Sequence, residues 1–312
     1  MISIVIPTFN RKELLYEALS SLFDCNCYDY QCVIIDDCSD DGTSDAVDGW
    51  MRQFGRDRIL YLRQDSNQGA QNARNRGIDE SSGDFLLFMD SDDIPCPHGI
   101  MDLYSHLRAN PHLDYCYGRV SKTDVNLVPL KNEDPVGKPF SDSAVHLGGY
   151  HWHTMGALYR KRCLKRVGYW NPVLTGSQDW EYQSRVKLFG GRGEFVDTLV
   201  GYWRQHDGAR VGTSLFRPDY VKSVMLASDS IIMHARNACR CDQALEERIA
   251  QRLFVHALEW GANGYVSERA QCLRQALSCI SKRGYLRLLL ILFLCIPPSL
   301  DLFVRRLLLK RL

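Results

Sequence analysis

Short apolar runs alternate with amphipathic stretches over residues 1–120 of the chain. Four apolar runs each predict a buried strand: residues 2–7, 31–35, 58–62 and 84–89. Between them lie stretches with helical spacing of apolar residues: residues 11–22, 43–54 and 68–80. Asn10 followed by Glu13 has the spacing of a capping box, so Asn10 is expected to cap the first helix. Apolar strands joined by helices predict an α/β fold whose mostly parallel sheet is covered by helices on both faces.

The pattern changes after residue 120. Residues 122–150 are rich in Pro, Gly, Asp and Asn, which predicts a loop. The later elements follow in chain order as a strand, a helix, a strand and a wholly helical region: residues 151–159, 179–189, 194–202 and 217–312. His151 and His153 flank Trp152, and the ring of Trp152 fits either a ligand contact or a buried anchor.

Polar residues stand where three of the predicted strands end. They are residues 8–10, Asp36 with Asp37, and the cluster of Asp90, Asp92 and Asp93. Ligands of parallel sheets bind outside the carboxyl ends of the strands, so these residues predict a binding site. Crowded carboxylates are typical ligands of Mg²⁺ or Mn²⁺, which also bind diphosphates, although a solvated acidic turn would give the same pattern.

Charge is distributed unevenly along the 312 residues. The net charge of +1 excludes a strongly basic nucleic-acid-binding chain, so no nucleic-acid partner is expected. Residues 282–312 nevertheless hold seven basic residues and one acid, Asp301, among long apolar runs. A pair of basic amphipathic helices on a membrane surface fits this tail, and a hairpin packed on the domain or in a homodimer is the alternative. Twelve scattered cysteines and a strand-like start predict reduced thiols in the cytoplasm.

Five segments resemble, in the same order, the motifs of the family 2 glycosyltransferases, which use nucleotide sugars and have the GT-A fold. They are IVIPTFNR (4–11), VIIDDCSDDGT (33–43), NQGAQNARNRGI (67–78), FLLFMDSDD (85–93) and GSQDWEYQSRV (176–186). The stretch YWRQHDGARVGTS (202–214) is similar to a further family motif, from which Asp207 and Ala209 depart. The resemblance implies a GT-A domain over residues 1–214. A helical C-terminal region over residues 215–312 remains, with its basic tail at 284–312.

The resemblance also implies roles for individual residues. Nucleotide-sugar contacts are expected from Pro7, Thr8, Asn10, Arg11, Asp37, Arg74, Asn75 and Asp92. Asp37 matches the residue that accepts the uracil N–H, and Asp93 matches the metal ligand, with His206 as a second candidate ligand. Asp179 matches the catalytic base, and Glu181 is a nearby fallback that the helical repeat turns away from it.

The function implied is an inverting glycosyltransferase that depends on Mg²⁺ or Mn²⁺ and transfers one sugar from a UDP-sugar to a hydroxyl group. A glycan or lipid-linked oligosaccharide acceptor at the inner face of a bacterial membrane fits the tail, as in the synthesis of O-antigen, capsule or exopolysaccharide. No spanning helix and no Q-x-x-R-W motif of processive synthases is present. A nucleotidyltransferase and a catalytically silent scaffold on the same fold remain as alternatives.

Overall fold

The computed structural model describes residues 1–24, 29–130, 135–137, 152–205, 218–280, 285–295 and 297. The chain divides into two compact units. The first comprises Met1–Phe140, His151–Pro172 and Phe189–Gly208, and the second comprises Ser141–Tyr150, Val173–Leu188 and Ala209–Leu312. Residues 173–188, which the sequence motifs place with the N-terminal domain, therefore belong to the second unit.

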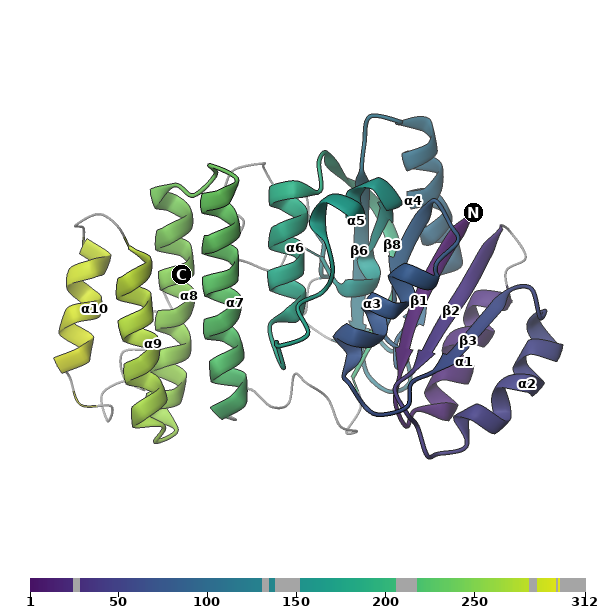
Figure 1. Cartoon of the computed structure of the whole chain (residues 1–312), viewed down its shortest axis with the longest axis horizontal. Helices are drawn as coiled ribbons and strands as arrows, with labels where there is room; N and C mark the ends of the chain where they lie inside the picture. Colours follow the sequence, from purple (N-terminus) through teal and green to yellow (C-terminus); the bar gives the residue numbers. More distant parts are fainter. Residues whose placement is uncertain are drawn as a thin grey trace. The chain divides into compact units, whose positions relative to one another are not determined.

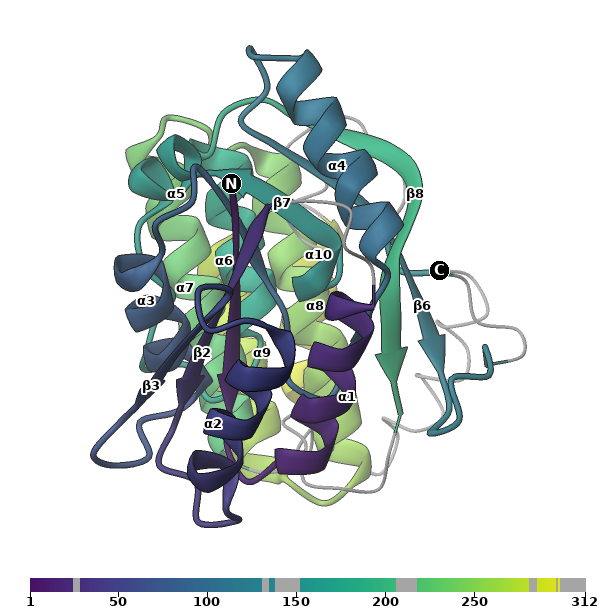
Figure 2. The ribbon, with the colours of Figure 1, turned by 90° about the vertical axis from the view of Figure 1, so that its right-hand side faces the viewer.

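The first unit is built on a sheet of eight strands within the described residues, in the order β3-β2-β1-β4-β7-β6-β8-β5. Figure 1 shows β1, β2 and β3 side by side at one end of this sheet. The strands are β1 (Ile2–Thr8), β2 (Tyr30–Asp36), β3 (Ile59–Arg63), β4 (Phe85–Phe88), β5 (Ile94–Pro95), β6 (Tyr115–Thr123), β7 (Ala157–Arg160) and β8 (Gly193–Arg204). β1 to β4 pair in parallel, and β6 runs parallel beside β8 (Figure 2). β7 is antiparallel to both β4 and β6, so the α/β fold is confirmed with a mixed sheet.

Helices cover both faces of the parallel part of the sheet, with α1 and α2 on one side and α3 on the other (Figure 1). The helices of this unit are α1 (Lys12–Phe23), α2 (Thr43–Phe54), α3 (Ala70–Glu80), α4 (Pro97–Ala109) and α5 (Lys161–Val167). α3 lies so close to β1 that a Cβ atom on Gly77 would be 2.2 Å from Cγ1 of Val5. A glycine is therefore needed for this close approach.

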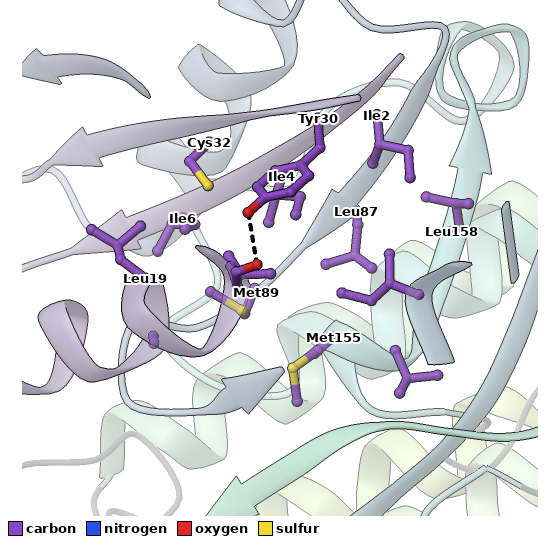
Figure 3. Packing of buried hydrophobic residues seen from close by; sticks show 14 of the residues in the cluster. Ile2, Ile4, Ile6, Leu19, Tyr30, Cys32, Leu87, Met89, Met155 and Leu158 are labelled. Atoms are coloured by element: carbon purple, nitrogen blue, oxygen red, sulfur yellow. Dashed lines mark hydrogen bonds between the residues drawn. The ribbon is translucent and has the colours of Figure 1, made fainter. Parts of the chain in front are cut away.

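The opposite face of β1 contributes to the main hydrophobic core. Ile2, Ile4 and Ile6 alternate along the strand and are fully buried, as the two-residue repeat of a strand requires. They pack with α1 residues such as Leu19 and with Leu87 of β4 (Figure 3). The buried Tyr30 hydroxyl donates a hydrogen bond to the Leu22 carbonyl at 2.8 Å, which ties β2 to the end of α1 (Figure 3).

Two local predictions are wrong. Asn10 does not cap α1, because its backbone adopts φ +51° and its side chain accepts a hydrogen bond from the Asp40 N–H at 2.9 Å. Asparagine tolerates this left-handed conformation, so Asn10 connects two loops instead. The strand predicted over residues 151–159 is shorter, since a 3₁₀ turn over Thr154–Gly156 precedes β7.

The second unit is helical in its described residues, as the sequence predicts. Its helices are α6 (Gln178–Phe189), α7 (Pro218–Asn237), α8 (Gln243–Ala262), α9 (Val266–Cys279) and α10 (Tyr285–Cys295). α7, α8, α9 and α10 lie side by side (Figure 1). The Asp242 side chain caps α8 by accepting a hydrogen bond from the Leu245 N–H at 2.8 Å.

α10 is the described part of the predicted basic tail. Leu290 and Phe293 are buried, and the Phe293 ring makes an edge contact with Phe254 of α8. Ile291 and Leu292 are exposed on the other side of the helix. None of the helices in the described ranges is both long and apolar enough to cross a bilayer. The tail from residue 298 onward lies outside the described residues.

Candidate active site

The polar ends of β1, β2 and β4 meet at one edge of the sheet. Thr8 and Asp36 are register partners at the carboxyl ends of β1 and β2. On the other side of β1, the Met89 N–H donates to the Val5 carbonyl at 3.0 Å, which places the start of the acidic loop beside β1. The three polar segments that follow these strands therefore come together, as expected for a parallel sheet.

The acidic cluster consists of Asp90, Asp92 and Asp93. One carboxylate oxygen from each lies within 4.8 Å of the others. Each carboxylate also has its own cationic or imidazole neighbour. The pairs are Arg74–Asp90 at 2.5 Å, Arg11–Asp92 at 3.0 Å and His153–Asp93 at 3.7 Å. Charge compensation explains how three carboxylates share so small a volume.

Asp93 is the most buried member, with 1% of its surface exposed. Its Oδ1 accepts a long hydrogen bond of 3.3 Å from the backbone N–H of Arg204 at the end of β8. Its own N–H donates to the Asp90 carbonyl at 3.2 Å, which closes a tight turn. The orientation of this carboxylate therefore depends on a strand 111 residues away in the chain.

His153 faces the cluster in a defined tautomer. Its Nδ1 accepts the Met155 N–H at 3.4 Å and so caps the 3₁₀ turn. A neutral imidazole whose Nδ1 is an acceptor carries its proton on Nε2, and this assignment directs the Nε2–H toward Asp93. The ring also packs on Trp203, with centroids 5.1 Å apart. His153 thus lies beside Asp93, whereas Trp152 is a buried anchor that donates to the Tyr159 hydroxyl. His151 lies outside the described residues.

Arg74 connects the cluster to a buried aromatic residue. Its guanidinium lies 4.6 Å from the centre of the Trp170 ring while it contacts Asp90. Desolvation is the largest single influence and raises the pKa of Asp90, but Arg74 and the other neighbouring groups together outweigh it, so this pKa lies below its usual value. Asn75 holds Trp170 in place, since its side chain donates to the Trp170 carbonyl and accepts from the Trp170 N–H. The sequence pattern contained no signal for Trp170.

Asp37 organises the loop between β3 and α3. Its Oδ1 accepts hydrogen bonds from the Gln64 side chain and from the Gln68 N–H, and its Oδ2 accepts the Gly69 N–H at 2.7 Å. Two carboxylate oxygens offer about four acceptor positions, so one position on Oδ2 is left by the residues that the structure describes. Gln64 follows the last residue of β3 and is buried, which is the same polar-strand-end signal that revealed Asp37.

The end of β1 contributes a hydroxyl and an aromatic ring. The Thr8 Oγ1 is buried and has no hydrogen-bond partner among the residues that the structure describes. Pro7 precedes it within the strand, and Phe9 follows it with 43% of its surface exposed. A buried hydroxyl of this kind calls for a partner, and a ligand beside an exposed ring can supply one.

Asp179 belongs to the second unit, where it is the second residue of α6. Glu181 is buried and accepts two hydrogen bonds of 2.8 Å from Arg185 and one of 2.7 Å from the Ser230 hydroxyl. A carboxylate held in this way is structural, so Glu181 is not a fallback base. His206 lies outside the described residues, and its predicted role as a ligand stays a prediction.

Comparison with known proteins identifies the family. The model of glycosyl transferase family 2 matches residues 3–172, which is more than half of the chain. The chain belongs to glycosyl transferase family 2. The family match includes the acidic cluster, Asp37 and Arg74, and it ends before Asp179.

Curated relatives of this family 2 glycosyltransferase match over part of their length. An uncharacterized glycosyltransferase of Haemophilus influenzae is 32% identical over 117 residues, which are 38% of this chain and 38% of the relative. The GalNAc(5)-diNAcBac-PP-undecaprenol beta-1,3-glucosyltransferase of Campylobacter jejuni is 38% identical over 93 residues, 30% of this chain and 29% of that relative. The aligned regions thus span about a third of the relatives.

Solved structures support the GT-A fold. S. aureus TarS 1-349 superimposes with a TM-score of 0.67 at 19% identity, covering 90% of this chain and 81% of that chain. The mannosyltransferase PcManGT from Pyrobaculum calidifontis superimposes with a TM-score of 0.54 at 15% identity, covering 97% of this chain and 83% of that one. Identities this low show the shared fold and leave the substrates of this chain undetermined.

Proposed function

We propose that this family 2 glycosyltransferase moves one sugar from a UDP-sugar to an acceptor hydroxyl, with inversion at the anomeric carbon. The observation that carries the proposal is the meeting of Asp37, Thr8 and the acidic cluster at the carboxyl ends of β1, β2 and β4. TarS, which shares the fold, was crystallised with UDP-GlcNAc. A diphosphate donor fits a site that pairs base-recognising groups with carboxylates and arginines.

Uracil recognition would use the end of β1 and the loop held by Asp37. The one acceptor position that remains on Asp37 Oδ2 suits the single N–H of a uracil edge. The Thr8 Oγ1 supplies a buried polar group beside it, and the exposed Phe9 ring offers a surface for stacking. Pro7, Asn10, Arg11, Arg74, Asn75 and Asp92 complete the proposed donor contacts.

A divalent cation fits the acidic cluster, because Mg²⁺ and Mn²⁺ prefer carboxylate oxygens and share them with phosphate oxygens. PcManGT was crystallised with GDP-Man and Mn²⁺. Asp93 would hold the ion, with Asp92 beside it. When bound, the ion would stabilise the negative charge of the leaving diphosphate.

Asp179 is the proposed general base. Its carboxylate would accept the proton of the acceptor hydroxyl as that oxygen attacks the anomeric carbon opposite the leaving UDP. The oxygen–carbon bond to the acceptor forms while the bond to UDP breaks, which inverts the configuration. A structural role is the simpler alternative, since an acidic residue near the start of a helix stabilises its positive end.

We also propose a lipid-linked glycan as acceptor and the cytoplasmic face of the membrane as the place of work. The Campylobacter relative is named for an undecaprenol-linked substrate. Ile291 and Leu292 of α10 are exposed, and the basic residues of the tail follow them in the sequence. The full chain should sediment with anionic lipid vesicles at low salt, and a chain ending at residue 284 should not. Equal sedimentation of both chains would contradict a membrane role for the tail.

The function is tested by titrating a panel of UDP-sugars with Mn²⁺ and following their slow hydrolysis. Asp93→Ala should abolish ion-dependent binding. Asp179→Asn should retain binding and lose turnover by about 10²- to 10⁴-fold. Asp197→Asn is a matched control, because Asp197 is an exposed partner of Arg119 and its loss should change neither quantity. If no nucleotide sugar binds the wild type, the catalytically silent scaffold is the better account.

A further inference from the structure

The segment in front of Asp179 is held by a residue of α7. The Ser223 hydroxyl accepts the Gly176 N–H at 2.9 Å and donates to the Gly176 carbonyl at 2.6 Å. A single buried side chain thus satisfies both backbone groups of one residue. The Tyr220 ring lies against the same residue, since a Cβ on Gly176 would be 2.4 Å from its Cδ2.

The segment in front of α6 has a conformation that is unfavourable by itself. Ser177 adopts φ +55°, a left-handed backbone that is unfavourable for a residue with a side chain. Its carbonyl accepts the first helical hydrogen bond of α6 from the Glu181 N–H, so Ser177 is the residue from which the helix starts. Its Oγ is buried without a partner among the described residues and therefore makes no cap. Such a conformation persists where the surroundings impose it, and Ser223 and Tyr220 are those surroundings.

The helix behind Asp179 is fixed in the same unit. Trp180 is fully buried, and the Arg252 guanidinium of α8 lies 4.1 Å from the centre of its ring. The Ser230 hydroxyl of α7 donates to Glu181 within the buried Glu181–Arg185 pair. α6 is therefore fixed in this unit, and Asp179 is its second residue, directly after the strained turn.

We infer that Ser223 is a positioning residue for Asp179, so that the helical C-terminal region is part of the transferase machinery. The inference rests on the proposed role of Asp179 as base. A carboxylate on a strained turn is displaced when the turn relaxes, and misplacement by about 1 Å can lower a rate by about 100-fold. Ser223 touches neither donor nor acceptor in this account and acts only through the backbone of Gly176.

Ser223→Ala tests the inference by two independent readouts. Amide hydrogen exchange at Gly176 should be faster by about tenfold, the equivalent of one lost hydrogen bond. Hydrolysis of the bound UDP-sugar should slow by about 10- to 100-fold while its KM stays unchanged. In an Asp179→Asn background, Ser223→Ala should cause no further loss of turnover, because a residue that acts through Asp179 has nothing left to position.

Ser228→Ala is the matched control. Ser228 is equally buried on α7, but its hydroxyl donates to the Val224 carbonyl of its own helix. It should lower the melting temperature about as Ser223→Ala does, with no effect on turnover. Unchanged exchange at Gly176 would overturn the inference. So would an additional loss in the Asp179→Asn background. Absence of UDP-sugar binding by the wild type would refute the proposed function instead, and hydrogen exchange would still report on the Ser223 contact.

Discussion

His153 shows how a single side chain acquires a role from its neighbours. The Met155 N–H fixes its Nδ1 as an acceptor, and Trp203 packs on its ring. Its Nε2–H is therefore directed toward Asp93, where the diphosphate of a donor is expected. The sequence marks His153 only as one of two histidines around a tryptophan, and the neighbour that defines its role is 60 positions away in the chain.

Two substitutions of His153 distinguish the contributions of its two nitrogen atoms to binding. Asn can reproduce the acceptor at the Nδ1 position but has no group at Nε2, whereas Gln can place an N–H donor near Nε2. His153→Asn should weaken binding of UDP by about tenfold or more, the value of a hydrogen bond to a charged group, and His153→Gln should retain most of the affinity. Calorimetric titrations with UDP and UMP measure this difference. If His153→Asn lowers the affinity for UDP and for UMP equally, the Nε2–H of His153 does not contact the second phosphate.

The packing of a helix against the sheet can depend on a glycine that lets the two backbones approach closely. Gly77 lies inside α3 where a Cβ would meet Val5 of β1 at 2.2 Å, whereas Gly49 lies inside α2 with nothing within 4 Å. The two glycines have the same helical backbone context and opposite packing. They therefore form a natural pair for measuring how tightly α3 fits the sheet.

Gly77→Ala should destabilise the protein by about 1–3 kcal/mol, because the added methyl group overpacks the α3–β1 contact. Gly49→Ala should stabilise it by about 0.5–1 kcal/mol, since alanine is the better helix former. Urea unfolding of the two variants gives both free energies. A stabilising Gly77→Ala would mean that α3 can move away from β1 without loss.

A carboxylate also joins α5 to the start of β8. Asp114 accepts hydrogen bonds from Arg162 at 2.7 Å and from the Arg192 N–H at 3.0 Å, and it pairs with Arg166 at 2.8 Å. Desolvation is the largest single influence and raises the pKa of Asp114, but the hydrogen bonds from Arg166, Arg162 and the Arg192 N–H, with the charge of Arg166, together outweigh it, so this pKa lies below the usual value. The folded state thus holds the ionised form more strongly than the unfolded state does.

This lowered pKa predicts the pH dependence of stability. A carboxyl with a depressed pKa stabilises the fold above its unfolded pKa of about 3.9, and the contribution disappears as the pH falls through the folded pKa. Asp114→Asn should therefore cost about 1–3 kcal/mol at neutral pH, with the difference from wild type closing below about pH 4. Denaturant unfolding at a series of pH values measures this. A difference that is constant with pH would assign the effect to packing.

The apolar runs predict β1 to β4 to within one residue at each end. For β1, β2 and β4, which are buried on both faces, the reason is that such a strand needs a continuous apolar segment. The alternation of strand and helix along the chain also predicts that the ends of β1, β2 and β4 meet. What local patterns could not predict are contacts between distant segments. Asn75 holds Trp170 across 95 residues, and the Arg204 N–H reaches Asp93 across 111. Local spacing predicts a cap at Asn10 because it takes no account of the loop at Asp40.

The boundary between the two compact units of the chain does not coincide with the end of the sequence motifs. The last motif-bearing helix, α6, belongs to the second unit with α7 and α8. Trp180 is covered by Arg252, and Glu181 needs Ser230, so α6 has its partners beyond residue 214. The GT-A motifs over residues 1–214 therefore do not define a segment that satisfies its own buried groups.

A chain ending at residue 214 should therefore fail to give a stable protein. The buried Glu181–Arg185 pair and Trp180 would be exposed to water, and the hydrophobic surface of α6 would favour aggregation. Soluble expression and a melting curve, compared with a chain ending at residue 284, test this. A cooperative unfolding transition of the shorter chain would show that residues 1–214 fold as a domain on their own.

The compensated charges of the acidic cluster have a consequence for the order of events during turnover. Arg74 and Arg11 already offset the charge of two of the three aspartates, so an isolated divalent ion meets a reduced net attraction. A nucleotide that arrives with its ion brings phosphate charges for the same arginines, and the side chains can exchange partners in one step. The enzyme should therefore be loaded by the ion–nucleotide complex and emptied of it as a unit, which would make departure of that complex a natural slow step of the cycle.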